Sequence, residues 1–245
     1  RWGNPLYRWD AMELDSFAWW KQRLAHLFSL VDVARLDHFR GFEAFWEIPA
    51  TEPTAEGGRW RAGPGEAFFE AVRGSLGPLP VIAEDLGIIT EGVTRLRRAC
   101  GFPGMRVMQF AFADTARNPY LPHNFGRCTV AYTGTHDNDT VRGWWDTASA
   151  HERNFAASYL DTDAEHVHWA MIRACCDSVA NITIFPLQDV LGLDGVHRMN
   201  VPGTIGAHNW TWRFTWDWID AEATRELEQA VATSGRGIQT SPHRA

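Results

Sequence analysis

The segment VDVARLDHFRGF, residues 31–42, decides how this 245-residue chain is interpreted. Apolar residues lead into an Arg-x-Asp pair, Arg35 and Asp37, and then into a glycine. Because strand side chains alternate between two faces, a strand over residues 31–39 would place Arg35 and Asp37 side by side at its far end. The guanidinium would keep the neighbouring carboxylate ionised. The motif therefore predicts either an oriented nucleophile or electrostatic stabiliser, or a structural Arg–Asp ion pair.

The composition disfavours several classes of function. A net charge of −7 argues against nucleic acid as a partner, because nucleic-acid-binding proteins usually carry a basic face. The sequence has no run of about 18 apolar residues, so we expect no membrane span, and its first residues do not resemble a signal peptide. The four cysteines form no Cys-x-x-Cys motif, and no histidine cluster has metal-ligand spacing. These features predict a cytoplasmic protein with reduced cysteines.

Short apolar segments alternate with helical patterns along the chain, which is typical of parallel βαβ units. We expect strands over residues 31–39, 79–86, 104–112, 128–134 and 181–187. We expect helices over residues 15–30, 66–74, 90–99, 163–179 and 221–232, with Thr90 and either Asp15 or Ser16 as N-caps. Residues 1–9, 41–66 and 203–218 are expected to form loops, and thirteen tryptophans are available for core packing or for stacking on sugar rings.

Three expected strands end in acidic residues: Asp37, Glu84 and Asp137. In parallel barrels the active site lies at the carboxyl ends of the strands, where residues from separate strands can converge. Glycine-rich nucleotide-binding motifs and the G-x-S-x-G motif are absent, which disfavours a nucleotide-binding protein or an α/β-hydrolase. Each acid alone could equally be a solvated strand end; all three together favour a site.

Different surroundings would give these acids different roles. Glu84 would share a strand face with Ile82 and Leu86, and an apolar wall favours the protonated form that a general acid requires. Asp37 would be charged, and this combination is typical of glycoside cleavage. Asp137 would then hold sugar hydroxyls in the transition state, with His136 donating a hydrogen bond to the same sugar.

At these residues the sequence closely resembles the amylomaltases, the 4-α-glucanotransferases of glycoside hydrolase family 77. The resemblance extends over nearly the whole chain. It is carried by the segments WGNPLYRW (2–9), ARLDHFRGFEAFWEIP (34–49), GRWRAGPGEAFFEAVR (58–73), LPVIAEDLGIIT (79–90), GFPGMRVMQFAF (101–112), YTGTHDNDTVRGWW (132–145) and NVPGTIGAHNWTWR (200–213).

The resemblance implies a (β/α)8 TIM barrel, retaining chemistry on α-1,4-glucans, and no metal or other cofactor. It implies Asp37 as nucleophile, Glu84 as acid/base and Asp137 as transition-state stabiliser. It further implies substrate-binding roles for Arg35 and His136, for the acceptor-side residues Trp2 and Gly3, and for Asn200, Pro202, Gly203, Asn209 and Trp210 beside the donor cleft. Gln188 and Asp189 are weaker candidates, for which a capping or turn role is as good an explanation.

The expected strands number five, whereas a closed barrel has eight. We therefore expect residues 1–245 to be the carboxyl-terminal part of a single catalytic barrel domain, carrying about strands four to eight. Such a remnant would expose two unpaired strand edges. The predicted activity is transfer of glucan segments between maltooligosaccharides; the alternatives are an α-amylase-type hydrolase and an inactive glycan-binding fragment.

Overall fold

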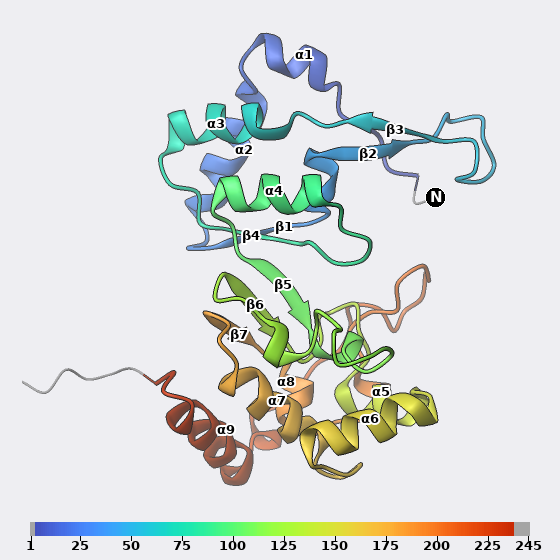
Figure 1. Cartoon of the computed structure of the whole chain (residues 1–245), viewed down its shortest axis with the longest axis vertical. Coiled ribbons are helices and arrows are strands. Elements are labelled where there is room, and N and C mark those ends of the chain that lie inside the picture. The colour runs from blue at the N-terminus through green and yellow to red at the C-terminus, as the bar shows by residue number, and fades with distance from the viewer. Residues whose placement is uncertain (1–2, 238–245) are drawn as a thin grey trace, which may run out of the picture. The chain divides into compact units, whose positions relative to one another are not determined.

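The computed structural model describes residues 3–237 and divides the chain into two compact units, Arg1–Met105 and Arg106–Ala245 (Figure 1). The larger sheet is five-stranded, with the order β1-β4-β5-β6-β7, and the boundary between the units falls inside β5. This succession of parallel strands and helices agrees with the expected incomplete barrel. Its assignment to barrel strands four to eight, and to a single domain, stays a prediction.

The described part of the first unit combines short parallel strands with α-helices, a 3-10 helix and an antiparallel hairpin. β1 pairs with β4 in parallel, and β4 pairs with β5 where Ala83 lies opposite Gly104. The elements are α1 (Trp9–Leu14), α2 (Ala18–Phe28), β1 (Ala34–Leu36), the 3-10 helix η1 (Phe39–Phe42), β2 (Ala44–Glu47), β3 (Arg59–Ala62), α3 (Gly65–Leu76), β4 (Val81–Ala83), α4 (Glu91–Cys100) and β5 (Gly104–Val107).

An aromatic core holds the first unit together. Phe39, Phe68 and Phe69 are completely or almost completely buried, and the rings of Phe42 and Phe68 lie 5.0 Å apart. Trp9 stacks on Trp20 with 6.1 Å between ring centroids. Aromatic side chains bury large apolar areas, so this cluster supplies much of the unit's stability and fixes the 3-10 helix that follows Asp37.

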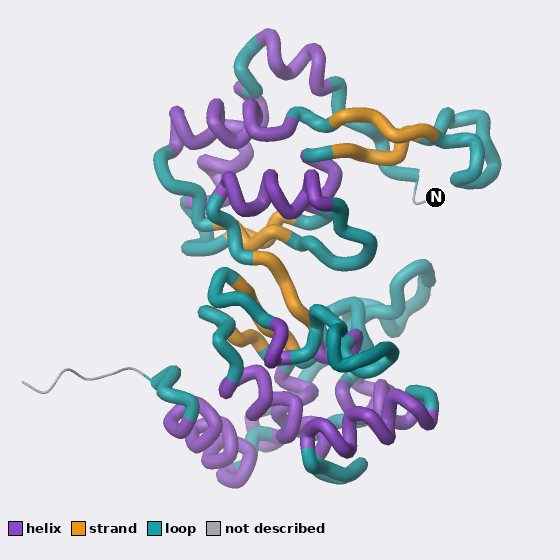
Figure 2. Tube along the Cα trace, in the orientation of Figure 1, coloured by secondary structure: helices purple, strands orange, loops and turns teal. Residues whose placement is uncertain are grey.

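The second unit pairs β6 with β7 in parallel, and Figure 2 shows several helices to one side of these strands. Its core contains Ala131 of β6 and Met171 and Cys175 of α7. The elements are η2 (Met108–Phe110), η3 (Pro122–Asn124), β6 (Thr129–Tyr132), α5 (Val141–Thr147), α6 (Ala150–Leu160), α7 (Val167–Asp177), β7 (Ile182–Ile184), α8 (Leu187–Val190), η4 (Gly195–His197), η5 (Trp216–Trp218) and α9 (Ala221–Thr233). Within residues 3–237, no helix has the length and hydropathy needed to span a bilayer.

All five expected strands are present, but they are shorter than the sequence predicted. The first begins at Ala34 rather than Val31 and ends at Leu36, because His38 adopts a left-handed backbone conformation with φ of 48° and the chain turns into η1. Val33 is therefore 48% exposed and Phe39 is buried in η1, so the predicted face shared by residues 31–39 is wrong.

Several helices and a hairpin differ from expectation. Thr90 caps α4 as predicted, accepting a hydrogen bond from the Val93 N–H. The expected loop over residues 41–66 instead contains the antiparallel hairpin β2–β3, in which Trp46 lies opposite Trp60. The helices α1, α5 and α6 were not predicted, although Ser149 and Glu152 form a capping box at the start of α6.

Candidate active site

Asp37 and Glu84 follow the last paired residues of two adjacent parallel strands. Leu36, the last residue of β1, lies opposite Ala83, the last residue of β4. Asp37 follows Leu36 and Glu84 follows Ala83, so the two acidic residues come directly after paired positions. Neighbouring strands lie about 4.8 Å apart, which brings the two acidic residues to the same strand end. Asp37 and Glu84 therefore leave adjacent strands at the same end of the sheet.

Arg35 orients the exposed carboxylate of Asp37. The Arg35 Nη1 atom donates a hydrogen bond to Asp37 Oδ1 at 2.8 Å, while its Nε lies 3.3 Å from the sulfur of Met105. The Asp37 side chain is 79% exposed and that of Arg35 only 29%. The predicted ion pair is confirmed, and it joins a fixed guanidinium to a carboxylate that solvent or substrate can approach.

Backbone amides hold the Glu84 side chain against the turn that follows Asp37. Its Oε2 accepts a hydrogen bond from the His38 N–H at 2.8 Å, and its Oε1 accepts one from the Leu86 N–H at 2.8 Å. The Phe39 N–H also bonds to the Glu84 carbonyl oxygen, at 3.1 Å. Because β4 ends at Ala83, Glu84 does not share a strand face with Ile82 and Leu86, which corrects that prediction.

The neighbouring acid, Asp85, has a structural role. Its side chain is almost completely buried; Oδ1 accepts the Met105 N–H at 2.7 Å, and Oδ2 lies 3.1 Å from Nε of Arg97. Asp85 thus ties the end of β4 to β5 and α4. The sequence places two acidic residues at the end of this segment. In the structure Glu84 lies at the candidate site and Asp85 lies in the core.

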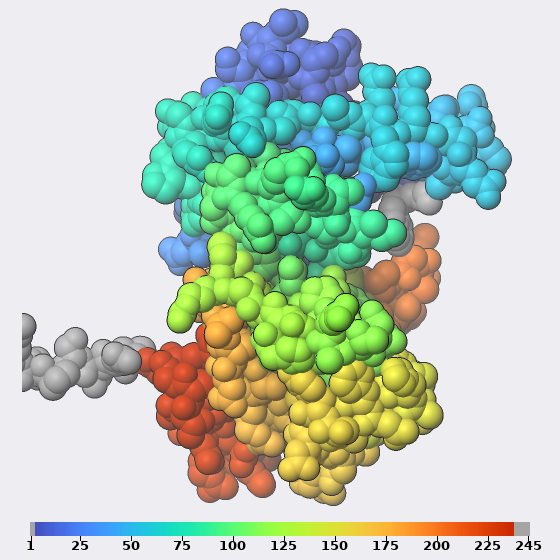
Figure 3. Space-filling view, in the orientation of Figure 1, coloured from blue at the N-terminus to red at the C-terminus, as the bar shows by residue number. Residues whose placement is uncertain are grey.

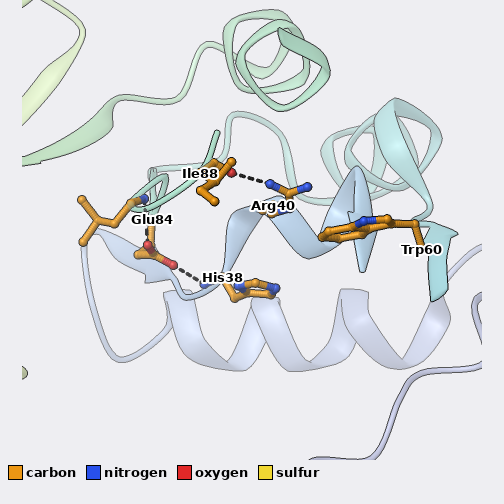
Figure 4. A pocket seen from close by; sticks show the side chains of 6 residues that line it. His38, Arg40, Trp60, Glu84 and Ile88 are labelled. Atoms are coloured by element: carbon orange, nitrogen blue, oxygen red, sulfur yellow. Dashed lines mark hydrogen bonds between the residues drawn. The ribbon is translucent and has the colours of Figure 1, made fainter. Parts of the chain in front are cut away.

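A cavity of about 330 Å³ adjoins the Glu84 carboxylate in the first unit. Figure 4 shows Glu84 and His38 on one side of it, and Arg40 lying over the indole ring of Trp60 on the other. The six lining residues come from the β1–η1 turn, η1, the β2–β3 hairpin and the loop after β4: His38, Arg40, Trp60, Glu84, Leu86 and Ile88. Sequence reasoning did not single out Arg40 or Trp60.

In the second unit, Asp137 is held by side chains from the segment after η4. Asn200 Nδ2 donates to Asp137 Oδ1 at 2.7 Å, and Nε2 of His136 lies 3.4 Å from Asp137 Oδ2. Arg198 donates to two backbone oxygens, that of Asp137 at 2.6 Å and that of Asn200 at 2.7 Å. The structure thus brings the predicted residues His136, Asp137 and Asn200 together.

Asp139 follows Asp137 by two residues, and its carboxylate lies close to Gly143 and Gly195. Its Oδ1 accepts the Thr140 N–H at 2.8 Å, and its Oδ2 lies 3.9 Å from Arg198 Nη1. Burial raises the pKa of Asp139, against the lowering effects of the Thr140 amide and the Arg198 charge. Arg198, which sequence reasoning missed, thereby links two acidic residues of the same loop.

The other predicted residues of this segment shape the loop itself. Asn209 accepts the Val201 N–H at 2.9 Å and donates to Thr204, closing a compact turn that contains Pro202 and Gly203. Trp210 has a positive φ of 63°, is 57% exposed and lies 5.2 Å from the His136 ring, centroid to centroid. An exposed indole is therefore fixed beside His136.

Gln188 and Asp189 make structural hydrogen bonds, which agrees with the capping or turn role that was one of the two interpretations for them. Asp189 is almost completely buried in α8 and accepts hydrogen bonds from Thr133 Oγ1 at 2.6 Å and from the Val141 N–H at 2.8 Å. Burial raises its pKa to about 6, although these two hydrogen bonds lower it. Gln188 donates to the His197 carbonyl oxygen at 3.2 Å.

Two predicted acceptor-side residues lie at the start of the chain. Trp2 lies outside the described residues. Gly3 is described, with a positive φ of 76° and no atom within 4 Å of where a Cβ would stand. Within residues 3–237, no group of three or more His, Cys, Asp or Glu side chains has a metal-binding arrangement. Asp137 belongs to the second unit, whereas Asp37 and Glu84 belong to the first. The expected convergence of these three acidic residues stays a prediction.

Comparisons with known proteins identify close relatives of this sequence. The family described as 4-alpha-glucanotransferase matches residues 1–219. The chain is 48% identical over 240 residues to a chloroplastic/amyloplastic 4-alpha-glucanotransferase of Solanum tuberosum, covering 96% of this chain and 41% of that protein. It is 51% identical over 222 residues to a 4-alpha-glucanotransferase of Thermus thermophilus, covering 87% and 44% respectively.

Among solved structures, the amylomaltase from Streptococcus agalactiae in complex with acarbose matches with a TM-score of 0.92 at 36% identity. That match covers 96% of this chain and 48% of the other. The amylomaltase from Corynebacterium glutamicum shares the fold, with a TM-score of 0.73 at 17% identity. The chain thus spans less than half the length of these relatives.

Proposed function

The chain belongs to glycoside hydrolase family 77, the 4-α-glucanotransferase family, and from this premise we propose that the protein carrying it transfers α-1,4-glucan segments between maltooligosaccharides. The observation that most supports the proposal is the register of β1 and β4, which sets Asp37 and Glu84 side by side at one strand end. The proposed substrates are starch- or glycogen-derived dextrins. A cytoplasmic location belongs to the same proposal.

The first half of the proposed reaction forms a covalent intermediate. A carboxylate oxygen of Asp37 attacks the anomeric carbon while protonated Glu84 donates its proton to the glycosidic oxygen. The bond between the anomeric carbon and that oxygen breaks, and a glycosyl–Asp37 ester remains. Arg35, which donates a hydrogen bond to Oδ1 of Asp37, orients the nucleophile before the attack.

The second half releases the product. Glu84, now a carboxylate, takes the proton from the 4-hydroxyl of an acceptor glucan, whose oxygen attacks the anomeric carbon and frees Asp37. Asp137, oriented by Asn200, holds sugar hydroxyls in both transition states, and His136 donates to the same sugar. Transfer exceeds hydrolysis when a bound sugar, rather than water, is positioned for this attack.

Substitution of the nucleophile tests this assignment. In the full-length protein, Asp37→Asn should lower the rate of maltotriose disproportionation on the order of a thousandfold or more, because the amide cannot form the ester. The nearby exposed Asp32→Asn is the matched control and should retain wild-type activity. A rate for Asp37→Asn within about tenfold of wild type would refute the role of Asp37.

The alternative functions give different products. An α-amylase-type hydrolase would increase reducing ends from maltotriose, whereas a transferase would produce glucose and longer oligomers without that increase. A glycan-binding fragment would bind maltotriose without turnover. We expect the isolated 245-residue chain to show little or no turnover, because it spans less than half of its relatives.

A further inference from the structure

The loop that carries Asp137 is held at both ends by one buried carboxylate. Oδ2 of Asp189 accepts a hydrogen bond at 2.6 Å from Oγ1 of Thr133, the residue directly after β6. Oδ1 of Asp189 accepts a second one at 2.8 Å from the N–H of Val141, the first residue of α5. Both Thr133 and Asp189 are almost completely buried. Residues 134–140 therefore begin and end beside a single side chain from α8.

The charge of Asp189 sets the direction of both hydrogen bonds. Burial raises its pKa to about 6, so the side chain is ionised at neutral pH and can only accept hydrogen bonds. The Thr133 hydroxyl and the Val141 N–H must therefore both donate. A buried charge lowers stability unless hydrogen bonds compensate for its lost hydration. Here the two compensating bonds come from the two ends of the loop that carries Asp137.

Contacts between these ends make the loop a compact turn. Nε2 of Gln109, a buried residue of η2, donates to the Asp139 carbonyl oxygen at 2.8 Å. A Cβ at Gly134 would lie 2.7 Å from the same Nε2 atom, so the chain passes close to Gln109 at this point. Oδ1 of Asn138 accepts hydrogen bonds from both the N–H and the Oγ1 of Thr135, at 2.9 and 2.8 Å. The turn can thus shift as a whole if its ends are released.

The side chain of Asp137 is also held from the surface of the second unit. Asn200, which donates to Asp137 Oδ1, precedes an exposed loop over residues 202–208, in which Ile205 is fully exposed. Figure 3 shows this region in orange at the margin of the second unit. Few packing contacts restrain such a loop. The buried carboxylate of Asp189 therefore gives the Asp137 loop a firmer attachment than Asn200 does.

We propose that Asp189 is a positioning residue for Asp137, because its two carboxylate oxygens hold both ends of the loop from Thr133 to Val141. The proposal rests on the proposed function, in which Asp137 holds sugar hydroxyls in the transition states. Asp189 does not touch the sugar. It acts by keeping the loop in one place, so that the Asp137 carboxylate meets those hydroxyls without a search for the correct geometry.

Substitutions at Thr133 in the full-length protein test this role with little change of shape. Thr133→Val removes the donor to Asp189, and kcat for maltotriose disproportionation should fall about tenfold while KM changes less than about twofold, because Asp137 acts in the transition state. Thr133→Ser restores the hydroxyl and should recover most of the lost kcat. Thr129→Val, the same change at a buried position at the other end of β6, is the matched control and should match wild type.

Two substitutions of Asp189 itself separate its hydrogen bonds from its size. Asp189→Leu removes both acceptors and should lower kcat at least as far as Thr133→Val does. Asp189→Asn offers an amide oxygen to the Val141 N–H and an amide N–H to the Thr133 hydroxyl, so it should recover most of the kcat lost in Asp189→Leu. Equal kcat values for Thr133→Val and Thr129→Val would overturn the proposal, whether or not Asp189→Leu folds.

Amide hydrogen exchange separates the role of Asp189 from the proposed function. In full-length Thr133→Val, peptides covering residues 134–141 should exchange about tenfold faster than in the wild type, whereas Thr129→Val should leave them unchanged. Faster loop exchange in a protein that transfers no glucan would support the hold of Asp189 on the loop and contradict only the proposed function. Unchanged loop exchange, or faster exchange with wild-type kcat in a transferring enzyme, would contradict only the role of Asp189.

Discussion

The carboxyl groups of this chain have contrasting surroundings. Asp37 projects from a strand end with its side chain 79% exposed, whereas Asp85 and Asp189 are buried and accept hydrogen bonds from backbone amides. The sequence revealed the Arg35–Asp37 pair because the two residues are only two positions apart. It could not show which acid of the Glu84–Asp85 pair faces the site, since that depends on where β4 ends.

Asp189 makes stability depend on pH in a predictable direction. Its folded-state pKa is about 6 against an ordinary value of 3.8, so between these values the folded state binds more protons than the unfolded state. Stability from this group is therefore present at low pH and lost as pH rises through that window. Relative to Asp189→Asn, the wild type should gain about 2 kcal/mol in unfolding free energy between about pH 7 and about pH 4.5.

Denaturant titrations of both proteins across this pH range measure the effect. The Asn variant is the appropriate reference because it keeps the size of the side chain but does not titrate. The difference in unfolding free energy between the wild type and the Asn variant should change with pH. A constant difference, or one that favours the wild type more at higher pH, would contradict the assignment of a buried, readily protonated Asp189.

At the scale of elements, the segment after η4 orients Asp137 through Arg198. Arg198→Lys removes the fork that bonds to the carbonyl oxygens of Asp137 and Asn200, so Asp137 should lose its fixed orientation. We expect kcat for transfer to fall about ten- to a hundredfold, with a smaller change in KM.

Arg213→Lys is the matched control for this substitution. Arg213 is exposed and donates a hydrogen bond to the carbonyl oxygen of its neighbour Trp212. Equal kcat values for the Arg198 and Arg213 variants would show that the segment does not depend on Arg198 to orient Asp137.

Two glycines in helices should respond oppositely to alanine. A Cβ at Gly143 in α5 would lie 2.4 Å from Asp139 Oδ1 and 2.7 Å from Gly195 Cα, so Gly143→Ala should destabilise the protein by about 1–3 kcal/mol. Gly74 in α3 has no atom within 4 Å of a Cβ, and Gly74→Ala should stabilise the protein by about 0.5–1 kcal/mol. Thermal denaturation measures both, and shifts of the same sign would contradict the described packing of α5 against Gly195.

The sequence predicted elements well where their signals were local. Thr90 caps α4, and all five expected strands are present. The strand ends were wrong because apolar residues continue after the chain has left the sheet. The β2–β3 hairpin was missed because its four-residue strands lie within a segment rich in glycine and proline. Trp60 and Arg40 were missed for the same reason: their contact requires that hairpin.

At the scale of the whole molecule, the sequence identified the family more completely than the site. Motifs spread over nearly the whole chain predicted the relationship that the comparisons confirm. The geometry within each compact unit could not be derived from these motifs. Arg198 is a case in point, since it contacts Asp137 across 61 positions of sequence. Long-range contacts of this kind leave no pattern in local spacing.

The central claim is that Asp37 carries the glycosyl group during transfer. In a Glu84→Gln variant of the full-length protein, α-maltosyl fluoride can still form the ester, because fluoride leaves without protonation, while the acceptor has no base to activate it. Mass spectrometry of the digested protein should find one maltosyl adduct, on the peptide containing Asp37. Release of fluoride with the adduct on a different residue, or with Asp37 unmodified, would contradict the account.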